Sequence, residues 1–123
     1  MKFLALILCV CALAVAQRRP DVQVIEAKAH RIEDGKIALD GRVKVGDKPL
    51  KGLVIIFDFL SSEGETLTSQ KIAADEDELD RGEESSFHAV TMNPPGAIRI
   101  RLRAFDSADR QLRIGNAGPF VIE

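Results

Sequence analysis

Hydrophobic and polar residues alternate along most of this chain. The alternation is cleanest over residues 36–45 and 98–104, where every second side chain is apolar and most of those between are charged. A period of two places successive side chains on opposite faces of a strand, so both segments are predicted to be half-buried β-strands. Gly41 falls on the apolar face of the first segment, which predicts a bulge or a close neighbour there.

One run, LVIIFDFL at residues 53–60, is apolar on both faces and rich in β-branched and aromatic residues. It is therefore predicted to be the central strand. Weaker strand patterns cover residues 22–32, 66–72, 85–92 and, broken by GNAGP, 112–122. The segment ADEDELDRGEE at residues 74–84 is expected to be an exposed loop, because its charges are too dense to pack.

Six or seven strands separated by turn signals, without a convincing helical pattern, predict an all-β fold. The expected architecture is an antiparallel immunoglobulin-like β-sandwich, and a closed barrel is the alternative. We assign residues 22–123 to this single domain and residues 17–21 to a short N-terminal linker. Roughly a hundred residues suffice to bury one core, but not two.

The first residues, MKFLALILCVCALAVA, indicate a signal peptide over residues 1–16. The apolar run from Phe3 to Ala16 would reach only about 21 Å as a helix, short of the roughly 30 Å of a bilayer core. Ala14 and Ala16 flank Val15 in the small-residue pattern of a cleavage site, so the mature chain is expected to start at Gln17. A lipid-modified cysteine is the alternative, although Cys9 and Cys11 follow the large residues Leu8 and Val10.

Both cysteines lie in the segment expected to be removed, so the mature domain would have no disulfide and no thiolate. The formal net charge of the whole chain is −2. A general attraction to nucleic acid or to anionic lipid is therefore not expected. The predicted location is extracytoplasmic, either periplasmic or secreted.

The order of these elements resembles the FxLYD type of domain, a bacterial extracytoplasmic β-sandwich. The resemblance covers residues 36–105 and runs through GRVKV, KGLVIIFDFLSSEGETL and ELDRGEESSFHA. The matching positions are Gly41, Val43, Phe57, Asp58, Gly64, Leu67, Leu79, Gly82, Glu83 and Phe87. The resemblance implies architecture and location, and it supplies no catalytic residues.

Arg99, Arg101 and Arg103 occupy every second position of the strand that Ile98, Ile100 and Leu102 place in the core. The arginines must then point to water. One interpretation is an ordinary solvated face whose arginines meet carboxylates on neighbouring strands. The other is a patch for an anion or an acidic partner, extended by Arg110 and Arg113.

The acidic loop offers a second candidate site, a calcium site that would use Asp75, Asp77 and Asp80. It does not follow the EF-hand pattern, because Leu79 occupies the fifth position and Asp80 the sixth. A solvated loop is the simpler interpretation. A third hypothesis is that the loop meets the arginines, within one molecule or between two.

The sequence offers little support for catalysis. His30 and His88 are far apart in sequence, and no serine lies in a G-x-S-x-G elbow. The chain has no Trp and no Tyr, the side chains on which sugars usually stack. We therefore expect a non-catalytic, exported module without a cofactor, which either binds another protein or contributes to an envelope assembly. The alternative is a calcium- or anion-binding accessory domain.

Overall fold

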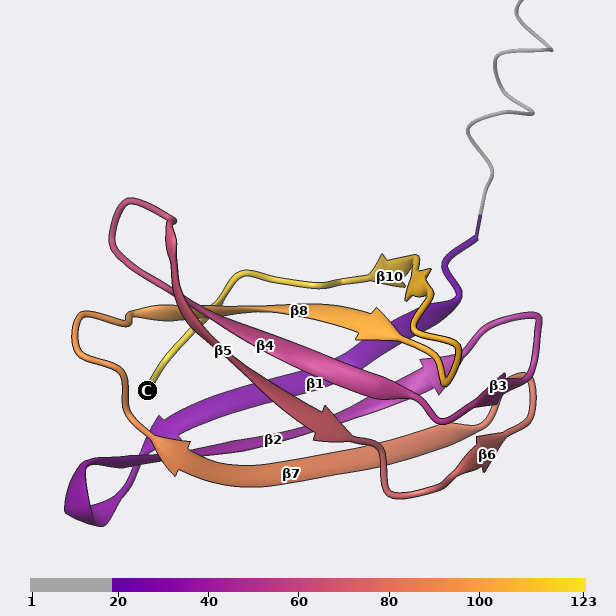
Figure 1. Cartoon of the computed structure of the whole chain (residues 1–123), viewed down its shortest axis with the longest axis horizontal. Coiled ribbons are helices and arrows are strands. Elements are labelled where there is room, and N and C mark those ends of the chain that lie inside the picture. The colour runs from indigo at the N-terminus through magenta and orange to yellow at the C-terminus, as the bar shows by residue number, and fades with distance from the viewer. Residues whose placement is uncertain (1–18) are drawn as a thin grey trace, which may run out of the picture.

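The computed structural model describes residues 19–123, and these residues are nearly all β (Figure 1). Six strands have seven residues or more: β1 (Val22–Arg31), β2 (Lys36–Val45), β4 (Val54–Leu60), β5 (Thr66–Ala73), β7 (Glu84–Met92) and β8 (Arg99–Phe105). Five strands have two residues: β3 (Leu50–Lys51), β6 (Glu78–Leu79), β9 (Gln111–Leu112), β10 (Ile114–Gly115) and β11 (Phe120–Val121). A 3₁₀ turn, η1 (Glu33–Gly35), joins β1 to β2. The expected signal peptide, with Cys9 and Cys11, lies outside the described residues.

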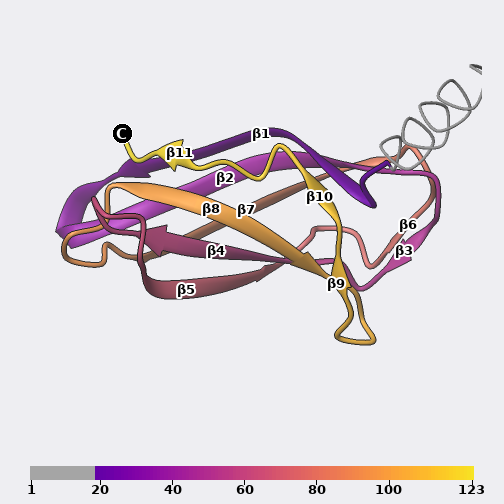
Figure 2. The same ribbon diagram turned by 90° about the horizontal axis from the view of Figure 1, so that it is seen from above.

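The strands form two stacked layers, so the all-β prediction is confirmed (Figure 2). One large sheet has the order β10-β1-β2-β7, and the other has β11-β8-β4-β5, with β9 pairing β8. β3 and β6 form a third, two-stranded sheet. The described sheets do not close on themselves. Apolar side chains from both layers fill the space between them, and Phe57 and Phe87 meet edge to face with their ring centroids 5.3 Å apart.

The predicted alternation holds along β2 and β8. Every second residue from Ile37 to Val45 is buried, as are Ile100, Leu102 and Ala104. Gly41 has the predicted close neighbour, because a Cβ there would overlap the Phe87 ring and lie 2.5 Å from the Glu26 carbonyl oxygen. The central-strand prediction is also confirmed, since β4 lies between β5 and β8.

The structure differs from the sequence prediction in the acidic segment. Residues 74–84 are not wholly an exposed loop, because β6 lies within them and pairs with β3. Leu79 is 2% exposed and belongs to the core. A single apolar residue among many charges was enough to anchor the segment, since Leu50 lies directly opposite it.

The last strand is split, and it closes one side of the two-layer structure. β10 pairs with β1 in a parallel arrangement, so the fold is not purely antiparallel, and β11 then pairs with β8 in the other sheet. Ile122 returns to β1 opposite Ala29. On the other side, β5 and β7 are the ends of their sheets. These two strands therefore leave backbone edges open.

The described residues 19–21 are attached to the domain. The backbone N–H of Asp21 donates to the carbonyl of Arg113 at 2.7 Å, and Gly46 N–H donates to the Asp21 carbonyl at 2.9 Å. Within residues 19–123 no helix has the length and apolar character that crossing a membrane requires.

Candidate functional site

The outer face of the β11-β8-β4-β5 sheet carries a concentration of positive charge. Arg99, Arg101 and Arg103 leave β8 on this face, and the register places Lys71 of β5 in the same row as Ile56 and Arg103. Residues opposite one another in a sheet share a face. We call Lys71, Arg99, Arg101 and Arg103 the basic face.

A buried carboxylate engages one of the four cations. Asp58 lies on β4 opposite Arg101, but the guanidinium of Arg103 reaches it diagonally. Arg103 Nε donates to Asp58 Oδ2 at 2.8 Å and Nη2 donates to Oδ1 at 2.9 Å. The Ser69 hydroxyl donates to Oδ1 at 2.6 Å. Because the Asp58 side chain is only 3% exposed and Arg103 is 39% exposed, the pair forms a fixed, partly buried bridge between β4, β5 and β8.

The surroundings of Asp58 favour its charged form. Burial by itself raises the pKa of this carboxyl group, because it removes water from the charge. Hydrogen bonds from Arg103 and Ser69, together with the charges of Arg103 and Arg101, outweigh burial and lower the pKa below its ordinary value. Asp58 raises the pKa of Arg103 in return. Both groups are therefore ionised under ordinary conditions.

The other cations of the basic face have no such partner among residues 19–123. Arg99, Arg101 and Lys71 make no ion pair and no side-chain hydrogen bond within that range. Arg101 and Lys71 are exposed, and Arg99 is half-buried. The expectation that the arginines meet carboxylates on neighbouring strands thus holds for Arg103 alone.

Arg110 and Arg113, the predicted extension of the stripe, contact other groups of the domain. Arg110 pairs with Asp106 at 3.1 Å in the turn after β8. The Arg113 side chain donates to the Arg19 carbonyl at 3.1 Å, and its N–H donates to Asp21. Lys71, which no pattern in the sequence connects with the stripe, lies on the same face, because β5 flanks β4 on the side away from β8.

The acidic segment contacts other parts of the domain instead of the arginines. Glu78 pairs with Lys51 at 3.9 Å, Glu76 accepts from the Ser85 hydroxyl at 2.6 Å, and Glu84 pairs with Arg42 at 3.2 Å. The hypothesis that this loop folds back on to the stripe of its own molecule therefore finds no contact among residues 19–123. Nor are Asp75, Asp77 and Asp80 brought together: no three His, Cys, Asp or Glu side chains in that range converge as metal ligands.

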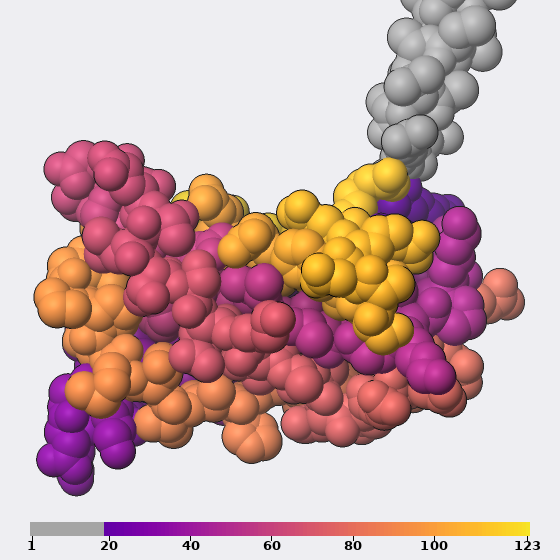
Figure 3. Space-filling model, in the orientation of Figure 1, coloured from indigo at the N-terminus to yellow at the C-terminus, as the bar shows by residue number. Residues whose placement is uncertain are grey.

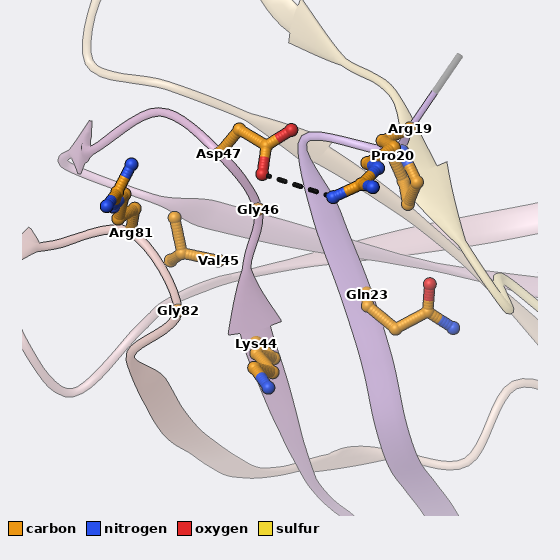
Figure 4. A pocket seen from close by; sticks show the side chains of 9 residues that line it. All are labelled: Arg19, Pro20, Gln23, Lys44, Val45, Gly46, Asp47, Arg81 and Gly82. Carbon is orange, nitrogen blue, oxygen red and sulfur yellow. Dashed lines mark ion pairs between the residues drawn. The ribbon is translucent and has the colours of Figure 1, made fainter. Parts of the chain in front are cut away.

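A second positively charged site lies at the end of the domain where the described chain begins. Arg19, Lys44 and Arg81, from three different segments, line a hollow of about 410 Å³. Figure 4 shows the residues that surround it. Asp47 is the acidic residue in its lining, and it pairs with Arg19 at 3.7 Å. The hollow thus combines three positive charges with one negative charge.

The histidines and serines are not arranged for acyl transfer. His30 and His88 are exposed residues on the outer face of the β1-β2-β7 sheet, where they occupy different rows. Ser85 hydrogen-bonds to Glu76 and Ser86, and Ser61 hydrogen-bonds within its own turn. Among residues 19–123 no serine hydroxyl donates to a histidine.

Comparisons with known proteins bear on the fold alone. No protein-family model and no curated protein matches the chain. The solved structure of IrmA from Escherichia coli is similar with a TM-score of 0.53 and 12% identity, over 85% of this chain and 99% of IrmA. A calcium-binding mutant of Bacteroides uniformis β-glucuronidase 2 has a TM-score of 0.48 and 13% identity, over 77% of this chain and 12% of that one. At these identities the likeness to IrmA shows a shared fold.

Proposed function

We propose that this chain is an exported, non-catalytic β-sandwich of immunoglobulin-like, FxLYD-like type that binds another protein through the basic face. The two-layer fold and the apolar N-terminal segment support the first part. The observation that carries the second part is the pairing of Asp58 with Arg103. It fixes one cation and leaves Arg99, Arg101 and Lys71 without a counter-charge among the described residues.

The partner surface is expected to be acidic. Charges that lack a counter-charge on one face raise the local concentration of oppositely charged partners and steer their approach. The whole chain has a net charge of −2, so this face differs in sign from the average of the molecule. A partner that matched the whole molecule by net charge alone would be basic, whereas a partner that matched this face is acidic.

The test neutralises the exposed cations and keeps both partners of the Asp58–Arg103 pair. The variant Arg101→Gln/Lys71→Gln is compared with the control Lys28→Gln/Lys36→Gln, which removes two exposed lysines from the opposite sheet. Tagged protein is used to capture partners from the envelope fraction of its own cells, and captured proteins are quantified by mass spectrometry. We expect the first variant to capture about tenfold less acidic protein than wild type, and the control to capture the same amount. Equal capture by both variants would contradict the proposal.

The hollow around Arg19, Lys44 and Arg81 supports a second candidate function, the binding of a small anion. Three cations around one recess of this size suit a phosphate or a carboxylate. Inorganic phosphate is the probe: a rise in melting temperature that Arg81→Gln abolishes and Arg101→Gln preserves would assign the anion site to this hollow. An unchanged melting temperature at millimolar phosphate would exclude it.

A further inference from the structure

The free edge of β5 is the feature that leads beyond the proposed function. β5 ends the β11-β8-β4-β5 sheet, whereas the opposite side of the domain is closed by the C-terminal segment. An edge strand carries backbone N–H and C=O groups that are available to another chain. Figure 3 looks on to the outer face of this sheet and shows that other segments leave this face of β5 uncovered.

The register identifies which backbone groups are free. Ala74 N–H donates to the Leu53 carbonyl at 3.0 Å, so this residue pair is hydrogen-bonded. Hydrogen-bonded and non-bonded pairs alternate along an antiparallel ladder. The backbone N–H and C=O groups of Gln70 and Ile72 therefore point toward β4. Those of Ser69, Lys71 and Ala73 point away from it. The Lys71 carbonyl accepts a hydrogen bond from its neighbour Gln70 Nε2 at 3.4 Å, which an incoming strand would replace.

A hollow of about 400 Å³ lies along this edge. Thr68, Ser69 and Gln70 all line it, and successive residues of a strand can do so only where the hollow meets the edge and not one face. Its other walls include the apolar side chains of Phe59, Met92, Pro94 and Pro95. Thr91 of β7 lines it too, and its hydroxyl donates to Gln70 Oε1 at 3.0 Å. Asn93 also lines the hollow, and its Oδ1 atom is buried without a hydrogen-bond partner in the described structure.

The two sides of the edge favour different side chains in an incoming strand. On the outer side, a residue opposite Lys71 would extend the row that already contains Arg103 and Ile56, so a carboxylate fits there. On the inner side, the alternate residues would enter the hollow beside Phe59 and Met92, so apolar side chains fit there. The outer side supplies charge complementarity, and the inner side supplies apolar contact.

We propose that β5 accepts an extended segment of the partner protein as an added strand, and that this segment alternates acidic and apolar residues. The inference rests on the proposed function and specifies the partner's binding element. Strand addition of this kind obtains affinity from main-chain hydrogen bonds and specificity from alternate side chains.

The test uses a blocked eight-residue peptide that alternates glutamate and valine, with hydrogen exchange of single amides read by NMR. In the free protein, the amides of Ser69, Lys71 and Ala73 should exchange quickly, and those of Gln70 and Ile72 slowly. The peptide should protect the first three at least about tenfold. The same peptide, N-methylated at the amides that face β5, should lose this protection, whereas methylation of the other amides should preserve it.

Lys71→Glu should weaken the peptide by about tenfold, and Lys28→Glu on the other sheet should leave its affinity unchanged. The inference is overturned if the peptide protects none of the three amides at roughly 1 mM. It is also overturned if the three amides gain protection with protein concentration alone, because a second copy would then occupy the edge. One pair of results would separate the two proposals. If the variant Arg101→Gln/Lys71→Gln no longer binds the native partner, the basic face is the interface. If that partner also leaves the three amides unprotected, it does not bind by strand addition.

Discussion

Arg103 reaches diagonally from β8 to hold Asp58 on β4 with two hydrogen bonds of 2.8 and 2.9 Å, although Arg101 is the residue directly opposite. The guanidinium carbon of Arg103 also lies 5.9 Å from the centre of the Phe105 ring. The diagonal pairing decides which arginines of the stripe are structural and which are free to act. Arg103 belongs to the fold, whereas Arg101 is available to a partner.

Breaking this pair from either side should have unequal effects. Arg103→Met leaves a buried carboxylate without its counter-charge and should lower the free energy of unfolding by about 3 kcal/mol. Asp58→Ala leaves an arginine that can turn to water and should cost about 1.5 kcal/mol. Urea unfolding measures both changes. The control is Arg101→Met, whose free energy of unfolding should lie within about 0.5 kcal/mol of the wild-type value. A value for Arg103→Met that matches this control would show that the pair contributes nothing.

Stability should depend on pH through Asp58. Its folded-state pKa lies below its ordinary value of 3.8, so its contribution is fully present above the unfolded-state pKa. That contribution should disappear as the pH falls through the lower, folded-state pKa. Asp58→Asn should therefore show a shallower loss of unfolding free energy below about pH 4 than wild type.

In the Asp58→Asn variant, part of the remaining dependence of the unfolding free energy on pH should come from Asp106. Its pKa is lowered chiefly because it accepts a hydrogen bond from the backbone N–H of Arg110, with a further one from Ala108. Chemical denaturation at a series of pH values gives both slopes. Parallel curves for wild type and Asp58→Asn would contradict the assignment to Asp58.

Leu79 should behave as a core residue despite its acidic surroundings. Leu79→Ala should cost about 2 to 4 kcal/mol, because the side chain is 2% exposed and the cavity cannot fully close. The matched control is Leu67→Ala on β5, where the leucine is 45% exposed and the cost should be below about 1 kcal/mol. Thermal unfolding compares them, and equal losses would mean that the β3–β6 pair is not part of the cooperative core.

Gly41→Ala should destabilise the domain by about 2 kcal/mol or more. The added methyl group would overlap the Phe87 ring, which could move, and would lie 2.5 Å from the Glu26 carbonyl oxygen, which is held by the sheet. Asp40→Ala, at the exposed neighbouring position, is the control. A stable Gly41→Ala variant would show that β1 and β2 can separate at the bulge between Val24 and Glu26.

The sequence predicted the strands well where alternation was long. β2, β4, β7 and β8 lie within one or two residues of their expected bounds, because β2, β7 and β8 alternate in burial and β4 is one continuous apolar run. The two-residue strands β3 and β6 were missed, because so short a strand has no periodicity to reveal it and their pairing depends on contacts distant in sequence. The last segment was expected as a strand over 112–122 broken by GNAGP, and the structure divides it into β10 and β11 with different partners.

The candidate site was predicted in part. The stripe was visible in the sequence, but the roles of its arginines depended on which strands flank β8 and β4. Asp58 stands out in LVIIFDFL as one charge within an apolar run, and this was the available signal for a buried ion pair. Lys71 could not be assigned to the same face without the register that sets Ile56 between it and Arg103.

The central claim is that the basic face docks a partner protein. Its most direct test is site-specific photo-crosslinking in the cells that make the protein, with the reactive amino acid at position 101, 71 or 28. We expect adducts with one acidic protein from positions 101 and 71, and none from position 28 on the opposite sheet. Adducts that form only from position 28, or equally from all three positions, would contradict the claim.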